Sequence, residues 1–120
     1  MTTQTSTRQI EPDITVMEIS GRLNLGNTLI SVEDAIRKLI KDGARKVVLD
    51  LKDLSYIDSS GIGLIVTCTG EMGQAGGHIR VAGAQGVVSR AFEIVRLSLV
   101  VPQDPDVETA CEALSARAAS

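Results

Sequence analysis

Apolar residues recur at two spacings along this chain, one typical of β-strands and one typical of α-helices. In residues 14–20 they alternate, so that Ile14 and Val16 face one side of a strand while Met17 and Ile19 face the other. The segment 47–49 is instead continuously apolar, which is typical of a strand covered on both faces. Strands are therefore expected at residues 8–11, 14–20, 46–51, 78–82 and 99–101.

Between these strands the spacing changes to that of amphipathic helices. One helix is expected after residue 21 and ends at Gly43, and a second is expected at about residues 59–75. The stripe of a short third helix consists of Val88, Phe92 and Val95. The last helix is expected to open with Asp104 as its N-cap and Pro105 as its first residue.

The predicted order of elements is β-β-α-β-α-β-α-β-α, which indicates an α/β fold. Strands separated by helices are usually parallel and joined by right-handed crossovers. We therefore expect a mixed, mainly parallel sheet of about four to five strands flanked by four helices. One domain is expected over residues 8–115, with flexible ends at 1–7 and 116–120. In such sheets ligands and partners gather beyond the carboxyl ends of the strands, and the loop after Leu51 lies at one of them.

Composition argues against several classes of function. The chain has 120 residues, of which 43% are apolar and 22% charged, so a folded domain is expected. Its 12 basic and 15 acidic residues give a net charge of −3 without any basic cluster, so nucleic acid is not an expected partner. The longest uncharged stretch, residues 59–70, is too short to span a membrane. The first residues lack the apolar core of a signal peptide, and a cytoplasmic location is expected.

Cys68, His78 and Cys111 are the residues that could suggest metal binding or nucleophilic catalysis. The two cysteines lie in apolar helical patterns, where a free thiol acts as a small hydrophobe. Zinc normally takes four ligands at short paired spacings, which these three scattered residues do not provide. His78 is expected to open a strand. We therefore expect no metal and no cofactor.

The most unusual segment is Asp58-Ser59-Ser60-Gly61-Ile62-Gly63, at a predicted strand-to-helix turn. Either serine can cap the helix, which is the structural interpretation. The segment lacks the third glycine of a dinucleotide-binding loop, the lysine of a Walker loop and the first glycine of a hydrolase elbow. Catalysis is therefore not expected, and a nucleotide-binding role is suggested only by glycine-rich turns.

Ser59 can instead be the substrate of a kinase. A phosphoryl group there is expected at the positive end of the helix dipole, beside free N–H groups. It adds a charge of about −1.5 to −2 next to Asp58 without unfolding the domain. A partner that packs over the helix start would then be released, because an unpaired dianion is costly to bury.

The sequence VVLDLKDLSYIDSSGIG at residues 47–63 resembles the STAS family, specifically its single-domain anti-sigma factor antagonists. GRLN at residues 21–24 and the later GGHIRVAGA add to the resemblance. The resemblance implies that Ser59 is phosphorylated by a cognate anti-sigma factor, which is a serine kinase, and dephosphorylated by a PP2C-type phosphatase. It also implies that the unmodified protein binds the anti-sigma factor and frees the sigma factor. The switch surface implied for this chain consists of Asn24, Asp58, Ser60, Gly61 and Ile62, with Ser60 as cap.

Asn24 departs from the family pattern, which commonly has an acidic residue at this position. The amide keeps its capacity for hydrogen bonds but carries no charge. Weaker phosphorylation is one consequence. The alternative is a STAS subunit of another assembly, either a stress-sensing scaffold or the partner of an ABC transporter ATPase. Asn24 can also be a plain turn residue, because asparagine is favoured in such loops.

Overall fold

The computed structural model describes residues 4–119, which form a sheet of six strands, four α-helices and one short 3-10 helix. In chain order the elements are β1 (Gln4–Ile10), β2 (Ile14–Leu23), α1 (Asn27–Lys41), β3 (Lys46–Asp50), β4 (Leu54–Ile57), α2 (Ser59–Gln74), β5 (His78–Ala82), α3 (Gly86–Val95), η1 (Leu97–Leu99), β6 (Gln103–Asp104) and α4 (Val107–Ala119). The predicted α/β class with four helices is confirmed, and the sheet has one strand more than expected.

The sheet is built around β2, which is ten residues long and pairs with three other strands. The order is β1-β2-β3-β5-β6, with β1 antiparallel to β2 and the remaining pairs parallel. The first part of β2 pairs with β3, and its last residues pair in parallel with β4. Leu23 lies opposite Ile57 in that pairing. The loops that leave β2 and β4 therefore start side by side.

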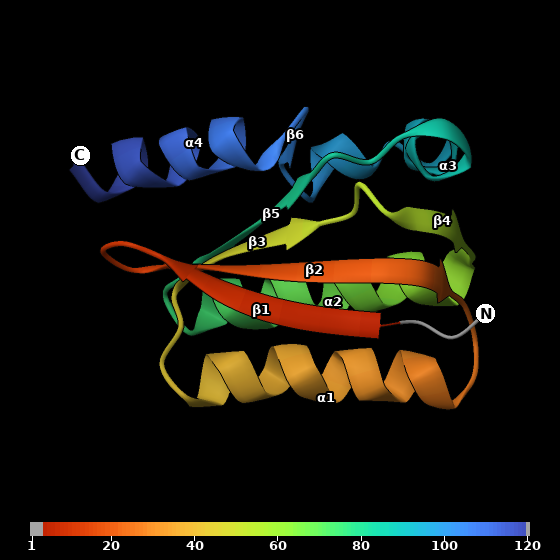
Figure 1. Ribbon diagram of the computed structural model, residues 1–120, viewed down its shortest axis with the longest axis horizontal. Helices are drawn as coiled ribbons and strands as arrows, with labels where there is room; N and C mark the ends of the chain where they lie inside the picture. The colour runs from red at the N-terminus through yellow and green to blue at the C-terminus, as the bar shows by residue number, and fades with distance from the viewer. Residues whose placement is uncertain (1–3, 120) are drawn as a thin grey trace.

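Helices cover both faces of this sheet, with α1 and α2 on one side and α4 on the other (Figure 1). The helix α3 packs beside β4, and its Val88 and Phe92 belong to the same core as the buried residues of α1 and α2. Met17 and Leu49 are opposite one another and belong to the main core, whereas the adjacent pair Val16 and Val48 belongs to a second core beneath α4. The predicted alternation of β2 between two buried faces is confirmed.

Two strands differ from the prediction because long-range pairing determines them. Residues 54–57 were expected in a loop, yet they form β4 against the end of β2. β1 begins at Gln4, within a segment expected to be flexible, because its polar residues pair with β2 in continuous register. His78 opens β5 as expected.

The end of the chain also differs in detail. The strand expected at residues 99–101 is wrong, because η1 occupies this region and only the short β6 follows. Asp104 is not the cap of the last helix, since its carboxylate accepts a hydrogen bond from Arg80 Nε at 2.7 Å. Asp106 takes the capping role by accepting from the Thr109 amide. Val95, expected on the buried stripe of α3, is exposed.

Candidate functional site

Ser59 is the first residue of α2 and is exposed to solvent. It follows β4 by a single residue, Asp58, so the end of the sheet fixes its position. The amide of Asp58 donates a hydrogen bond to the Leu23 carbonyl at 3.2 Å, which continues the pairing between β4 and β2. The serine is therefore presented at the carboxyl edge of the sheet, where the sequence placed the site.

Asp58 is the N-cap of α2 and joins two segments through its carboxylate. Its Oδ1 accepts a hydrogen bond from the Gly61 amide at 3.0 Å, and its Oδ2 accepts one from the Leu25 amide at 3.1 Å. The Gly61 N–H lowers the pKa of Asp58, partial burial opposes this, and the Leu25 N–H lowers it further. The prediction that a serine caps this helix is therefore wrong, and Ser60 does not have that role.

The Asp58 carboxylate changes which N–H groups at the start of α2 are available to bind an anion. The Gly61 amide donates to the Asp58 side chain, and the Ile62 amide donates to the Asp58 carbonyl at 3.0 Å. The Gly61 N–H, one of the groups that were expected to be free, is thus engaged within the protein. A phosphate on Ser59 would lie beside an ionised carboxylate rather than in an empty anion site.

Gly61 is required by close packing against β2 and β4. A Cβ atom at this position would lie 2.6 Å from the Leu23 carbonyl oxygen and 2.7 Å from Ile57 Cγ1. At Gly63, two residues further along the helix, a Cβ atom would have no neighbour within 4 Å. Gly61 is therefore part of the scaffold that holds the loop before α1 against the start of α2.

The remaining predicted residues surround this scaffold. Ser60 and Ile62 are half-buried, and Ile62 packs against the main core. Asn24 is half-buried in the loop between β2 and α1, next to the residue whose amide binds Asp58. The sequence did not indicate Leu25, which is fixed by that hydrogen bond while its side chain is 76% exposed. Only the pairing of β2 with β4 reveals its place in the site.

Burial favours the neutral form of both cysteine thiols. Burial raises the pKa of the Cys68 thiol to about 11. Burial also raises the pKa of Cys111, against a smaller opposing effect of Arg8. Among the described residues no group of three or more histidine, cysteine or acidic side chains could hold a metal ion. In the same part of the chain no helix is long and apolar enough to cross a membrane.

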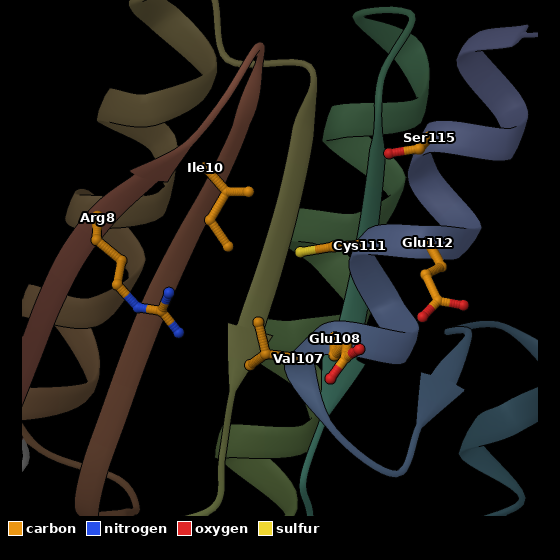
Figure 2. Close-up of a pocket in the computed structure, with 7 residues that line it drawn as sticks. All are labelled: Arg8, Ile10, Val107, Glu108, Cys111, Glu112 and Ser115. Carbon is orange, nitrogen blue, oxygen red and sulfur yellow. The ribbon is translucent and has the colours of Figure 1, made fainter.

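Cys111 lies in a separate cavity of about 680 Å³ between β1 and α4 (Figure 2). Apolar side chains of Ile10 and Val107 face the cavity, with Arg8 at its β1 side and acidic residues on the helix. None of the predicted site residues lines it. It is thus distinct from the surface around Ser59.

Fold and site together define a small α/β domain that presents an exposed serine at a helix start, held by the preceding aspartate. The STAS domain model matches residues 6–110, and the chain belongs to the STAS domain family.

Relatives and solved structures agree with this assignment. The chain is 28% identical over 81 residues to an anti-sigma-B factor antagonist of Staphylococcus aureus, covering 68% of this chain and 74% of the relative. It resembles the crystal structure of an anti-sigma factor antagonist from Mycobacterium paratuberculosis with a TM-score of 0.83, at 19% identity and 95% coverage of both chains. The structure of unphosphorylated SpoIIAA, an anti-sigma factor antagonist, gives a TM-score of 0.78 at 20% identity, covering 94% of this chain and 97% of SpoIIAA.

Proposed function

We propose that this protein is an anti-sigma factor antagonist controlled by phosphorylation of Ser59. In its unmodified form it binds an anti-sigma factor that is also a serine kinase, and it thereby regulates transcription that depends on a sigma factor. Phosphorylation of Ser59 releases the partner, and a PP2C-type phosphatase restores the unmodified form. The chain acts as a binding module in the cytoplasm and as the substrate of these enzymes.

The observation that carries this proposal is the exposed Ser59 directly after the Asp58 cap. A kinase can reach the hydroxyl without any unfolding of α2. The names of relatives support the same role, and SpoIIAA has been solved in a phosphorylated as well as an unphosphorylated form.

The geometry supports release through electrostatics. A phosphate adds a charge of about −1.5 to −2 beside Asp58, whose lowered pKa keeps it ionised at neutral pH. The Gly61 amide already donates to Asp58, so it is not free to donate to the phosphate. A bound partner would have to desolvate both charges, which opposes binding.

Incubation with the cognate kinase and ATP, followed by peptide mass spectrometry, tests the proposal. We expect one phosphate on Ser59, none on Ser59→Ala, and normal modification of the matched control Ser60→Ala. A Ser59→Asp variant should remain folded and lose its partner. Phosphate on another residue, or full binding by Ser59→Asp, would contradict the proposed switch.

A STAS subunit of another assembly is the second candidate, because Asn24 lacks the carboxylate common at this position. The residue lies in the loop that Asp58 holds through the Leu25 amide, so a change of charge there alters the surface next to Ser59. Neighbouring genes discriminate the two candidates. A serine kinase or PP2C-type phosphatase gene favours sigma control, and permease and ATPase genes favour a transporter.

A further inference from the structure

Exposed aliphatic side chains are concentrated in one part of the chain. Eight large apolar side chains are exposed among the described residues, and five of them lie within residues 87–100. This segment forms α3 and η1, on the opposite side of the molecule from α1 (Figure 1). Large exposed apolar surfaces mark sites where another molecule binds.

The helix α3 is apolar on its outer side as well as on its inner side. Val88 and Phe92 face inward and are buried in the main core. Val87 and Ile94 are seven residues apart and therefore share one stripe of the helix, where they are 60% and 75% exposed. Helices that are apolar on all sides are usually buried. The outer stripe of α3 is therefore a surface that no part of the described chain covers.

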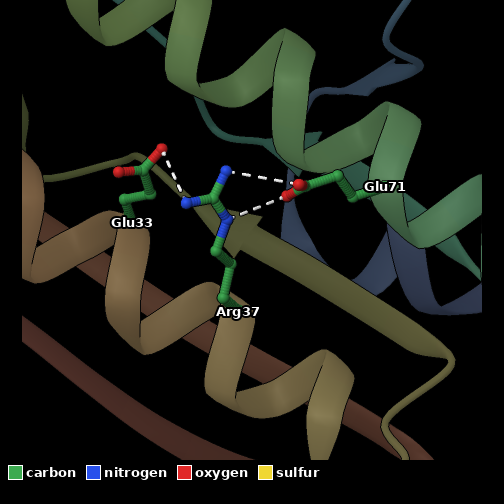
Figure 3. Close-up of polar contacts among 3 residues, drawn as sticks. All are labelled: Glu33, Arg37 and Glu71. Carbon is green, nitrogen blue, oxygen red and sulfur yellow. Dashed lines mark hydrogen bonds and ion pairs between the residues drawn. The ribbon is translucent and has the colours of Figure 1, made fainter.

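The charges on α3 also differ from those on the other helices. On α1, Arg37 pairs with Glu33 at 3.4 Å and donates to both carboxylate oxygens of Glu71 on α2, at 3.1 and 3.2 Å (Figure 3). On α3 the only charged residues are Arg90 and Glu93, both exposed, and neither makes an ion pair within residues 4–119. Both charges are thus available to a binding partner.

The order of these residues matches a second copy of α3 that runs in the opposite direction. A twofold axis between two antiparallel helices brings the same flank of each helix together in reverse order. An axis near the half-buried Ala91 places Val87 of each copy against Ile94 of the other. The same axis places Arg90 of each copy beside Glu93 of the other. The apolar stripes and the charges are therefore complementary to themselves.

The balance of charge favours a second copy over a different protein. One positive and one negative residue make the outer side of α3 neutral, so it does not attract a partner of strong single-sign charge. A partner of one sign would also leave one of these two charges unpaired. A second copy pairs both.

We infer that the α3 face, which consists of Val87, Arg90, Ala91, Glu93 and Ile94, binds a second copy of this chain with the two α3 helices antiparallel. The aliphatic stripes form the centre of the interface, and two Arg90–Glu93 pairs form its rim. This face contains none of the residues of the predicted switch surface, and the inference does not depend on the proposed function.

Sedimentation equilibrium of the full chain at increasing concentration tests the inference. We expect the mass of wild type to rise from 12.7 kDa towards twice that value. Ile94→Lys should weaken dimerisation about tenfold or more, because each lysine would be buried against an apolar stripe. Ile30→Lys on α1 is the matched control, since Ile30 is 55% exposed, and it should dimerise like wild type. Thermal melts verify that both variants fold.

Exchange of the charges tests the antiparallel arrangement. Arg90→Glu and Glu93→Arg should each weaken dimerisation, because like charges then meet across the twofold axis. A mixture of these two single variants should associate again, since an acidic flank then meets a basic one. The double variant Arg90→Glu/Glu93→Arg should dimerise like wild type. Lys41→Glu, a charge reversal at an exposed position of α1, is the matched control.

Several outcomes would overturn the inference. A wild type that stays monomeric at every concentration would do so, as would a dimer that persists in Ile94→Lys. An equal loss in Ile30→Lys would move the contact to α1. Failure of the mixed variants to associate would exclude the antiparallel arrangement. A monomeric wild type whose Ile94→Lys variant loses binding to the anti-sigma factor would assign the α3 face to that partner instead.

Discussion

Gly61→Ala should destabilise the domain, even though alanine is the better helix former. Its Cβ would lie 2.6 Å from the Leu23 carbonyl oxygen and 2.7 Å from Ile57 Cγ1. Neither neighbour can move freely, because Leu23 and Ile57 are paired across the end of the sheet and the Leu23 carbonyl accepts from the Asp58 amide. Overpacking of this kind costs about 1–3 kcal/mol.

Gly63→Ala provides the reference that isolates this cost. Its Cβ meets nothing within 4 Å, so the variant should gain up to about 1 kcal/mol from helix propensity alone. The difference between the two variants is then about 1–3 kcal/mol, because both gain a similar propensity term. Urea unfolding at 25 °C with equal m-values measures it. Equal stability of the two variants would refute the argument that Gly61 is fixed by the contact between β2 and α2.

Three further substitutions test other contacts. Asp58→Asn should lower stability at neutral pH. Because the folded state holds the pKa of Asp58 below its usual value, the stabilisation exists above about pH 4 and is lost as the pH falls further. Urea unfolding from pH 7 to pH 3 should therefore bring the stabilities of the variant and wild type together. Asn24→Asp should accelerate phosphorylation of Ser59 in a radiolabelled kinase assay if a carboxylate in this loop assists the kinase, and an unchanged rate would favour the other assembly. Asp104→Asn removes the negative charge and one of the two acceptor oxygens from the largely buried pair with Arg80. It should cost about 3 kcal/mol by denaturant unfolding, whereas a loss below about 1 kcal/mol would show that the pair behaves as if exposed.

Elements with buried apolar faces could be predicted from the sequence, because the spacing of their apolar residues reflects which of their faces are covered. The alternation of β2 and the continuous run of β3 correspond to their two covered faces. β4 has only four residues and was not predicted, and β1 is almost wholly polar and exposed, so only its last residues, within the strand expected at 8–11, were predicted. Their structure comes from hydrogen bonds to β2, and the local sequence does not contain that information.

The same distinction applies to side chains that can act as caps. Asp104 and Asp106 both precede the last helix and both have the chemistry of an N-cap. Arg80, twenty-four residues away in the sequence, binds the first, and the second caps the helix. A local motif therefore named the right kind of residue at the wrong position.

At the candidate site this distinction alters the chemistry. Asp58, Ser59 and Ser60 are all suitable caps, and the sequence alone favoured a serine. Because β4 ends at Ile57, Asp58 stands at the capping position, and its carboxylate accepts from the Gly61 amide at the start of α2. A phosphate on Ser59 then meets a fixed negative charge that also holds the Leu25 amide. Repulsion at this point acts on the loop before α1 as well as on the helix start, so one modification can alter both segments while the core beneath stays intact.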